Sequence, residues 1–496
     1  MAGFDAVIIG GGLGGLLSGN ILSKEGFNVC LIEKNQKPGG ALQTFGRKGC
    51  IFNTGLNYTE SLDEGQILNR YFRYFGLMDK PIFRRLDADG FEIINFPDGQ
   101  YRFAMGQQNF IETLTRDFPA EKAALKEYTH RIEEICKAIS LYSLREEQLS
   151  IIENYDLSSG AADFIRKVVS DPRLRNILAG NNLLYSGHET KTPLFIHALI
   201  NHSFIESAWR VTGGSHQLVN VLASNIKSNG GTILTGSKAV KLTGEKDTIR
   251  GVVLENGDYI EGKQFIAAMH PDQVLGMVEP GMIRKAFASR IRGLEDTMGM
   301  FTLYLVFKKN SFPYINHNFY NFNQNNVWVA SDYKVSQWPQ NYLFMTSLAS
   351  GPGGYAESGS VITYMDYDEL KRWENTFTGD RGADYLEFKD SKAEILLDAV
   401  EKQFPGIRNT IAARYTSTPL TWRDYTGTRA GSAYGILKDC NRPMESMVLP
   451  RTKISNLFLT GQNTNVHGIL GVTISSVVTC GELIDIKYLV RRIRQA

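Results

Sequence analysis

A run of closely spaced glycines near the N-terminus constrains this chain more than any other feature. Apolar residues 6–9 are typical of a buried parallel strand, and Gly10, Gly12 and Gly15 follow them in the pattern G-x-G-x-x-G. A helix-compatible segment comes next, and a second apolar strand then leads to Glu33. In such a unit the first glycine permits a tight turn, the second lets a pyrophosphate approach the backbone, and the third lets helix and strand pack closely. The sequence therefore predicts a Rossmann-like α/β domain that binds an adenine dinucleotide at a helix start.

Three further features indicate which dinucleotide is bound. Glu33 suits the ribose of NAD or FAD and argues against a 2′-phosphate, because a carboxylate accepts hydrogen bonds from ribose hydroxyls. The pair Gly39–Gly40 follows closely and places more backbone near the pyrophosphate. A second glycine-bearing segment, 457–478, carries Gly461, Gly468 and Gly471 between a short strand and a helix-compatible run. A long cofactor needs a second helix start at its far end, so the sequence favours FAD.

Composition excludes several classes of function. The chain has 496 residues, 43% of them hydrophobic, which is enough for two domains or one large interleaved fold. The 54 Lys and Arg residues balance 52 Asp and Glu, so the charge shows no nucleic-acid-binding signature. The five cysteines are scattered and form no C-x-x-C pair, which argues against a zinc site or a disulfide framework. A reducing, cytoplasmic location is expected.

The sequence predicts no membrane-spanning helix and no cleavable signal. The apolar run 469–478 is about half of the roughly 20 residues that a span requires. The terminal segment 487–496, KYLVRRIRQA, mixes apolar and basic residues and is compatible with peripheral contact with an anionic membrane surface. A solvated helix end is the simpler interpretation of the same segment.

The order of patterns along the chain predicts two interleaved domains. Residues 107–200 are mostly helical in pattern, whereas the aromatic and β-branched stretches 301–309, 326–331, 342–349 and 360–366 suggest an antiparallel sheet. The cofactor domain is assigned to residues 1–80, 208–297 and 411–496, and the substrate domain to residues 81–207 and 298–410. Long helices beside an apolar sheet favour an apolar cavity next to the cofactor, although the same surfaces also suit an ordinary core.

Four segments, in the same order, resemble the carotenoid desaturase and isomerase superfamily of FAD enzymes, and within it the branch that contains all-trans-retinol saturase. They are GGALQTFGRKGCIFNTGLNY at 39–58, HALINHSF at 197–204, STPLTWRDYTGTRAGSAYGI at 417–436 and NLFLTGQ at 456–462. The resemblance implies a glutathione-reductase-like FAD-binding domain with an interleaved α+β substrate domain.

The resemblance also implies which residues contact FAD. It places one set at the pyrophosphate and ribose, a second along the cofactor, and a third around its far phosphates and isoalloxazine ring. These are Gly10, Gly12, Leu13, Gly14 and Gly15 with Glu33 and Lys34; then Gly40, Ala41, Leu42, Gly55, Leu56 and Val240; then Gly461, Gln462, Leu470, Gly471 and Val472.

For the reaction, the resemblance implies saturation, desaturation or isomerisation of a long apolar polyene, with the flavin carrying hydride. NAD(P)H is a candidate transient electron donor. A proton must also move, and Tyr434 and Tyr58 are favoured for that role or for stacking over His202, His270, Tyr425 and His467.

Two alternatives to this reaction stay open. One is a flavin amine oxidase. Leu303 is expected to occupy the place of the flavin-facing lysine of amine oxidases, which argues against this alternative. The other is an FAD-loaded isoprenoid carrier without turnover.

Overall fold

The first sheet of the computed structural model is the predicted nucleotide-binding sheet. The structure describes residues 3–80, 82–146, 156–331, 333–349 and 353–496. Five strands of this sheet pair in parallel and two complete it as an antiparallel meander. The parallel strands, in spatial order, are β10 (Thr232–Leu234), β2 (Val29–Ile32), β1 (Phe4–Ile9), β13 (Tyr259–Ala267) and β19 (Leu457–Leu459); the meander adds β12 (Thr248–Leu254) and β11 (Ala239–Glu245). The Rossmann-like α/β fold predicted from the sequence is confirmed.

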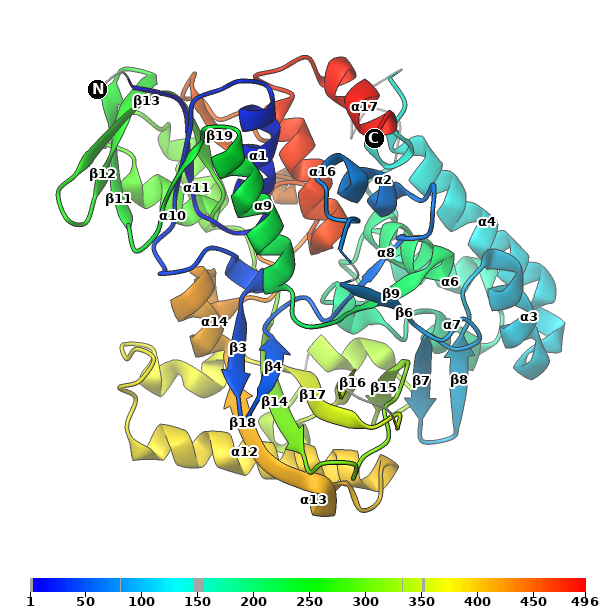
Figure 1. Cartoon of the computed structure of the whole chain (residues 1–496). Coiled ribbons are helices and arrows are strands. Elements are labelled where there is room, and N and C mark those ends of the chain that lie inside the picture. Colours follow the sequence, from blue (N-terminus) through cyan, green and yellow to red (C-terminus); the bar gives the residue numbers. More distant parts are fainter. Residues whose placement is uncertain (1–2, 81, 147–155, 332, 350–352) are drawn as a thin grey trace.

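Three helices pack together beside this sheet. They are α1 (Leu13–Lys24), α9 (His216–Ser228) and α16 (Gly468–Cys480), and α1 packs against both of the others (Figure 1). Small side chains allow the close contact between α1 and α16: Ser476 donates a hydrogen bond to the Gly14 carbonyl at 3.3 Å. The two ends of the chain therefore meet in one layer.

The second sheet contains seven strands and lies below the first in Figure 1. In order these are β18 (Ile411–Ser417), β14 (Gly299–Phe307), β17 (Ala356–Met365), β16 (Asn341–Leu348), β15 (Asn318–Phe322), β7 (Glu92–Phe96) and β8 (Gly99–Phe103). Helix α12 (Ala383–Gln403) covers one face, where Leu396 and Val400 join the strand residues in an apolar core. Three of the four predicted strands are present.

The fourth predicted strand, 326–331, is wrong. Val327–Ser331 form a 3₁₀ turn, and the strand lies earlier, at β15. The Asn176 side chain accepts from the Val327 N–H at 3.1 Å, and Asn182 donates to the Val327 carbonyl at 2.9 Å. These side chains take the backbone bonds that a sheet would use. The predicted antiparallel pairing is confirmed for β14, β16 and β17. The sheet as a whole is mixed, because β15 runs parallel to β7.

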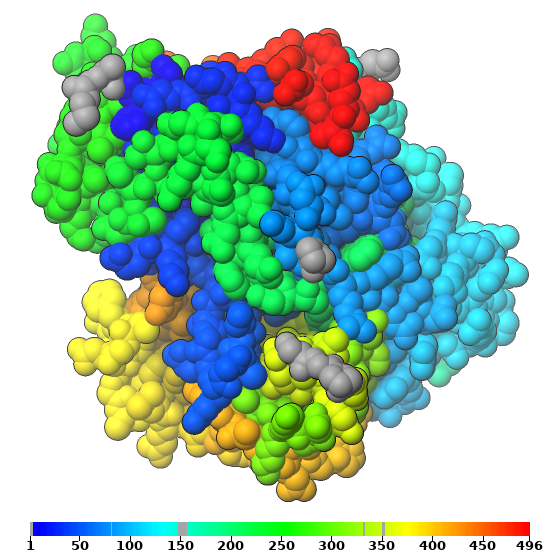
Figure 2. All heavy atoms as spheres, viewed as in Figure 1, coloured from blue at the N-terminus to red at the C-terminus, as the bar shows by residue number. Residues whose placement is uncertain are grey.

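A helical layer packs beside the second sheet, in agreement with the helical pattern of residues 107–200. Its members are α2 (Ile67–Tyr74), α3 (Gln107–Asp117), α4 (Lys122–Ala138), α5 (Ser140–Ser143), α6 (Ala161–Val168), α7 (Pro172–Leu178) and α8 (Leu194–Glu206). The small sheet β5 (Tyr58–Glu60), β9 (Ala208–Val211) and β6 (Phe83–Arg85) links this layer to the first domain. The hairpin β3 (Thr44–Arg47) and β4 (Cys50–Asn53) reaches the molecular surface beside the second sheet (Figure 2).

The predicted domain division stays a prediction. One hydrogen-bonding pattern bears on its boundary: β18 begins at Ile411 but pairs with β14 of the second sheet. The remaining helices are α10 (Pro271–Met277), α11 (Lys285–Arg292), α13 (Ile407–Thr410), α14 (Pro419–Thr426), α15 (Pro443–Ser446) and α17 (Ile486–Arg494).

Helix α17 carries the basic terminal segment. Its apolar residues Leu489, Val490 and Ile493 are buried in the core, so its exposed face consists mainly of basic side chains. In the described part of the chain, no helix combines the length and apolar character needed to cross a bilayer.

Candidate active site

The first glycine turn has the geometry that its sequence predicts. Gly10 has φ +105°, and a Cβ placed there would lie 2.8 Å from the Ala268 carbonyl oxygen. A Cβ on Gly15 would lie 1.9 Å from the Gly10 carbonyl oxygen, so this glycine permits contact between α1 and β1. Gly12 differs from both, because its Cβ would meet only the Gly40 Cα, at 4.0 Å. The second glycine therefore faces open space, as the approach of a pyrophosphate requires.

The second and third glycine segments converge on this turn. Gly39 donates to the Gly11 carbonyl at 2.7 Å, and a Cβ on Gly40 would lie 3.1 Å from the Gly12 Cα. From the far end of the chain, the Gly461 Cα lies 3.0 Å from where a Gly14 Cβ would be. Segments separated by more than four hundred residues thus meet at the start of α1. We call this meeting point of Gly12, Gly40 and Gly461 the glycine junction.

The space at this junction suits a cofactor. Gly461 is buried and has φ +97°, yet a Cβ there would meet no atom within 4 Å. Thr460, next to it, has a buried hydroxyl without a hydrogen-bond partner in the chain. An enclosed gap bounded by glycine backbone and an unsatisfied hydroxyl fits the phosphates of a dinucleotide.

The acid after β2 lies beside the glycine turn. Glu33 is 5% exposed, and its two carboxylate oxygens accept from the N–H groups of Gly11 and Asn35, each at 2.8 Å. These bonds fix the carboxylate where the ribose of a bound dinucleotide is expected. Lys34 turns away and donates to the Asp424 carbonyl at 2.8 Å, and burial lowers the pKa of its amine.

The other predicted cofactor contacts fall into two groups. In the first group, Gly55 packs closely against Ala41, since a Cβ on Gly55 would lie 2.8 Å from the Ala41 carbonyl oxygen, and Leu42 and Leu56 belong to the same buried apolar cluster. Val240 lies apart on the meander, 38% exposed, at a bulge of β11.

At the far end of the predicted cofactor path, Leu470, Gly471 and Val472 lie in the first turns of α16, and Gln462 follows Gly461. The cofactor roles of these residues stay predictions.

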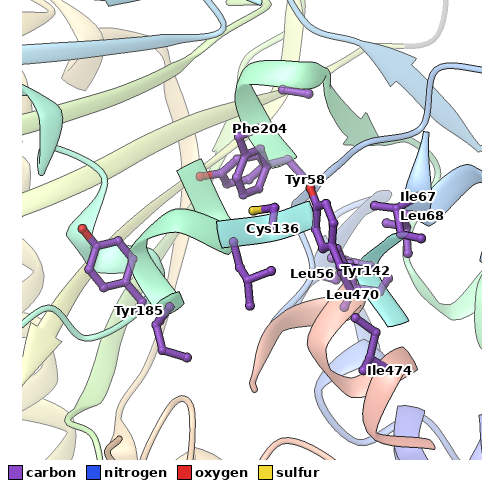
Figure 3. Packing of buried hydrophobic residues seen from close by; sticks show 14 of the residues in the cluster. Leu56, Tyr58, Ile67, Leu68, Cys136, Tyr142, Tyr185, Phe204, Leu470 and Ile474 are labelled. Carbon is purple, nitrogen blue, oxygen red and sulfur yellow. The ribbon is translucent and has the colours of Figure 1, made fainter. Parts of the chain in front are cut away.

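An apolar cavity of about 50 Å³ adjoins the start of α16. Helices α8 and α16 supply half of its lining residues. Leu470 and Ile474 of α16 are labelled in Figure 3, near Leu56 and Tyr142. The cavity is lined by Glu60, Ile139, Leu157, Phe195, Leu199, Ile200, Ser203, Met447, Asn465, Val466, His467, Leu470, Gly471 and Ile474. The structure thus contains an apolar cavity at the predicted position, beside the residues expected to contact the isoalloxazine ring.

Tyr434 and His467 form an aromatic pair near this cavity. Their ring centroids are 4.5 Å apart, and the Tyr434 hydroxyl donates to the Leu183 carbonyl at 2.9 Å. His467 Nε2 lies 3.1 Å from the Leu184 carbonyl oxygen. Burial lowers the pKa of His467 to about 4, so this ring is neutral at physiological pH. The pair anchors the Leu183–Leu184 turn.

Tyr58 belongs to a buried polar network. Its hydroxyl donates to Glu92 Oε1 at 3.0 Å and also hydrogen-bonds with Tyr320. Asn181 donates to the other carboxyl oxygen at 3.4 Å. Burial raises the pKa of Glu92 to about 8, which keeps this carboxyl protonated at neutral pH. Sequence reasoning missed Glu92, because its partners lie far apart in the chain.

The remaining candidates have local structural roles. His270 Nε2 lies 3.0 Å from Asp296 Oδ1, which anchors the start of α10. Tyr425 is 47% exposed, and burial lowers the pKa of His202 to about 4. In the described ranges, no group of three or more His, Cys, Asp or Glu residues is placed to bind a metal ion.

The expected position of Leu303 in front of the flavin is wrong. Leu303 is fully buried on β14 and packs with Leu396 and Val400 of α12. Strand residues alternate between faces, so the neighbouring positions Thr302 and Tyr304 point to the opposite side of the sheet. The argument against an amine oxidase that rested on Leu303 therefore does not hold.

Comparison with known proteins places this geometry in a family. The model of the flavin containing amine oxidoreductases matches residues 13–482. The all-trans-retinol 13,14-reductase of Danio rerio is 22% identical, over 97% of this chain and 86% of that protein. The 4,4′-diaponeurosporene oxygenase of Staphylococcus aureus strain USA300 is 24% identical, over 93% of this chain and 94% of that protein. These relatives confirm the resemblance to the retinol saturase and carotenoid branch.

Solved structures agree on the fold. An oxidoreductase from Methanosarcina mazei superposes with a TM-score of 0.64 at 16% identity, covering 95% of this chain and 98% of that one. A putrescine oxidase bound to putrescine gives a TM-score of 0.63 at 13% identity, covering 97% and 98%. Because the family model spans nearly the whole chain, the protein is an FAD-dependent oxidoreductase that belongs to the flavin containing amine oxidoreductases.

Proposed function

We propose that this enzyme acts on a long apolar polyene of the isoprenoid type, by saturation, desaturation or isomerisation of its carbon–carbon bonds. The apolar cavity beside the first turn of α16 carries this proposal, because its wall is mainly aliphatic and aromatic. The names of the relatives support it, since they refer to a retinol and to a diaponeurosporene.

The residues of the glycine junction would hold the cofactor. Gly12, Gly40 and Gly461 offer backbone to its phosphates, and Glu33 faces its ribose. Bound FAD would supply reversible two-electron chemistry at the cavity wall. The chain's own contribution is to orient an apolar chain and to exclude water, which Phe195, Leu199 and Ile474 achieve by lining the cavity.

The catalytic roles proposed for Tyr58 and Tyr434 are limited by their hydrogen bonds. The Tyr434 hydroxyl is held by a carbonyl and the Tyr58 hydroxyl by a carboxyl. We assign Tyr434 to the shape of the site, as a ring stacked on His467, and Tyr58 to the position of β5. NAD(P)H remains our candidate electron donor, and it would dock transiently to the oxidised holoenzyme.

The test is a substrate panel on the purified yellow protein. Anaerobic reduction should bleach the flavin, and a carotenoid or retinoid should then restore its colour while the absorbance spectrum of the polyene changes. Adding NADH or NADPH to the oxidised protein tests the electron donor.

Peroxide release from amines, with no reaction of any polyene, would replace this proposal by an amine oxidase. Tight polyene binding with no change in flavin redox state would replace it by a carrier.

A further inference from the structure

Glu60 is the one carboxyl group among the residues that line the apolar cavity. It is the last residue of β5. A carboxyl group is out of place in a wall made of Phe195, Leu199 and Ile474, because burying such a group costs free energy unless it has partners or a task. Neither the predicted cofactor contacts nor the proposed hydrocarbon binding makes use of it.

The position of Glu60 is fixed from two sides. Within the small sheet, Glu60 of β5 pairs with Ala208 of β9, and the hydroxyl of the preceding residue, Thr59, donates to Glu60 Oε2 at 3.1 Å. On the other side, the Leu470 N–H hydrogen-bonds to the carboxyl group from the first turn of α16. Leu470 is also a predicted isoalloxazine contact. Glu60 therefore lies at the end of the cavity where the flavin is expected.

We infer that Glu60 is the catalytic acid–base group that exchanges a proton with the polyene carbon next to the one that exchanges hydride with the flavin. This inference rests on the proposed function and extends it to a named proton carrier. Glu60 is a catalytic residue in this account because it lines the cavity that the substrate is proposed to enter.

The step balances for saturation of one double bond. The C=C π bond breaks, and two C–H bonds form on adjacent carbons. One hydrogen arrives with its electron pair from reduced FAD, and the other arrives as a proton from the Glu60 carboxyl group. The polyene is reduced by two electrons, FAD is oxidised by two, and the Glu60 carboxylate recovers its proton from solvent. Desaturation is the reverse, with Glu60 as the base.

The electrostatic surroundings permit both roles. Burial raises the pKa of Glu60 to about 7, against smaller opposing contributions from Thr59 and the Leu470 N–H. A general acid–base group works best when its pKa lies near the working pH. Tyr142 of α5 interacts electrostatically with Glu60, and burial raises the pKa of Tyr142. His467, at the start of α16, lines the same cavity, and burial lowers its pKa.

The other candidates for the proton are engaged elsewhere. The Tyr434 hydroxyl donates a hydrogen bond to the Leu183 carbonyl, and the Tyr58 hydroxyl donates a hydrogen bond to the Glu92 carboxyl group. Neither tyrosine is among the residues that line the cavity. His467 lines the cavity, but its pKa of about 4, lowered by burial, leaves it without a proton to give. Glu60 alone combines contact with the cavity and a pKa near neutrality.

The first experiment measures the proton on Glu60 without any turnover. Infrared difference spectra of the FAD-loaded protein between about pH 5 and about pH 9 should show, besides the carboxylic acid of Glu92, a second protonated carboxylic acid that titrates near neutrality. This band should be lost in Glu60→Gln and kept in the control Glu206→Gln, whose carboxyl group bonds to Ser61 at 2.9 Å and does not line the cavity. A Glu60 carboxyl group that is already ionised at about pH 5 would overturn the inference, whatever the substrate proves to be.

The second experiment follows the proton into the product. A single turnover of the dithionite-reduced protein with a polyene in D₂O should place two solvent deuterium atoms in the product, measured by mass spectrometry, because the hydrogen that reduced flavin transfers also comes from solvent. Glu60→Gln should slow reoxidation of the flavin by the polyene about 100-fold or more, with unchanged FAD content and unchanged reduction by dithionite. Glu60→Asp should keep part of the rate with a shifted pH profile, and Glu206→Gln should match the parent.

The outcomes separate the two proposals. If no polyene reoxidises the parent flavin, the proposed function fails, whereas the infrared titration still decides whether Glu60 carries the proton. If the parent reacts and Glu60→Gln reacts equally fast with the same deuterium incorporation, the role of Glu60 fails and the proposed function stands.

Discussion

The glycine junction and the apolar cavity are neighbours in space but differ in how the sequence specifies them. At the junction, Gly12, Gly40 and Gly461 leave room because they have no side chain, so the motif specifies the local backbone shape directly. The cavity is bounded by Leu199, Met447 and Ile474, which are ordinary core residues from distant segments. A binding site made of backbone can be recognised in a short segment, whereas a cavity depends on how the whole fold closes around it.

The variant Gly15→Ala should have the largest effect, and it tests whether the glycine motif specifies the local backbone shape. Its Cβ would lie 1.9 Å from the Gly10 carbonyl oxygen, a backbone atom that cannot move without separating α1 from β1. We expect a loss of about 4 kcal/mol or more in the free energy of unfolding, measured by urea denaturation. The matched control is Gly276→Ala in α10, where a Cβ meets no atom within 4 Å. Equal stability of the two variants would contradict the assigned role of Gly15.

Gly12→Val separates folding from cofactor binding. A side chain at Gly12 enters open space beside Gly40, so the protein should fold with its normal circular dichroism. The same side chain fills the space assigned to the pyrophosphate, and FAD affinity should fall about 100-fold, a cost of roughly 2.7 kcal/mol. Flavin fluorescence during titration of the apoprotein measures this change. Retention of full affinity would move the cofactor away from this turn.

Leu199→Trp tests the cavity in the same way. Leu199 is buried on α8 and lines the cavity, so a larger side chain there takes up space needed by the substrate. We expect polyene turnover to fall at least about 10-fold with unchanged FAD content. Overpacking should also lower the free energy of unfolding by about 1–3 kcal/mol. Leu386→Trp, on α12 at 61% exposure, should leave turnover unchanged. A normal rate for Leu199→Trp would place the substrate elsewhere.

Glu92 provides a pH test of the buried network beside the cavity. Burial raises the pKa of Glu92 from 4.5 to about 8, so between these values the folded protein holds a proton that the unfolded chain has released. Stability from this group is therefore complete below about pH 4.5 and falls as the pH rises towards 8, by up to about 1.4 kcal/mol per pH unit. Glu92→Gln should flatten that part of the unfolding profile. An unchanged slope would show that Glu92 is ionised in the folded state.

Tyr434→Phe should have the smallest effect. It removes one hydrogen bond, to the Leu183 carbonyl, while the ring stays stacked on His467. A change of about 1 kcal/mol in stability and a few-fold change in turnover are expected. A loss of about 100-fold in turnover would instead make this hydroxyl a proton carrier, as the sequence had suggested.

The fold could be predicted where a residue pattern is local and periodic. The turn Gly10–Gly15 and Glu33 after its strand both form as expected. The error at 326–331 arose because Asn176 and Asn182 bond to a short β-branched stretch that otherwise resembles a strand.

Two features of the site could not be found in the sequence. Glu60 and Glu92 have no motif, because their raised pKa values arise from burial by segments far away in the chain. Leu303 was misplaced because a single strand of fully buried residues does not show which face meets the cofactor.

The central claim is that FAD lies across the glycine junction with its reactive ring against the apolar cavity. A crystal structure of the yellow protein with a bound polyene tests it most directly. The account predicts the pyrophosphate between Gly12, Gly40 and Gly461, and the isoalloxazine ring beside Leu470 with the polyene next to Glu60. A cofactor bound elsewhere, or a ring separated from the polyene by core side chains, would contradict it.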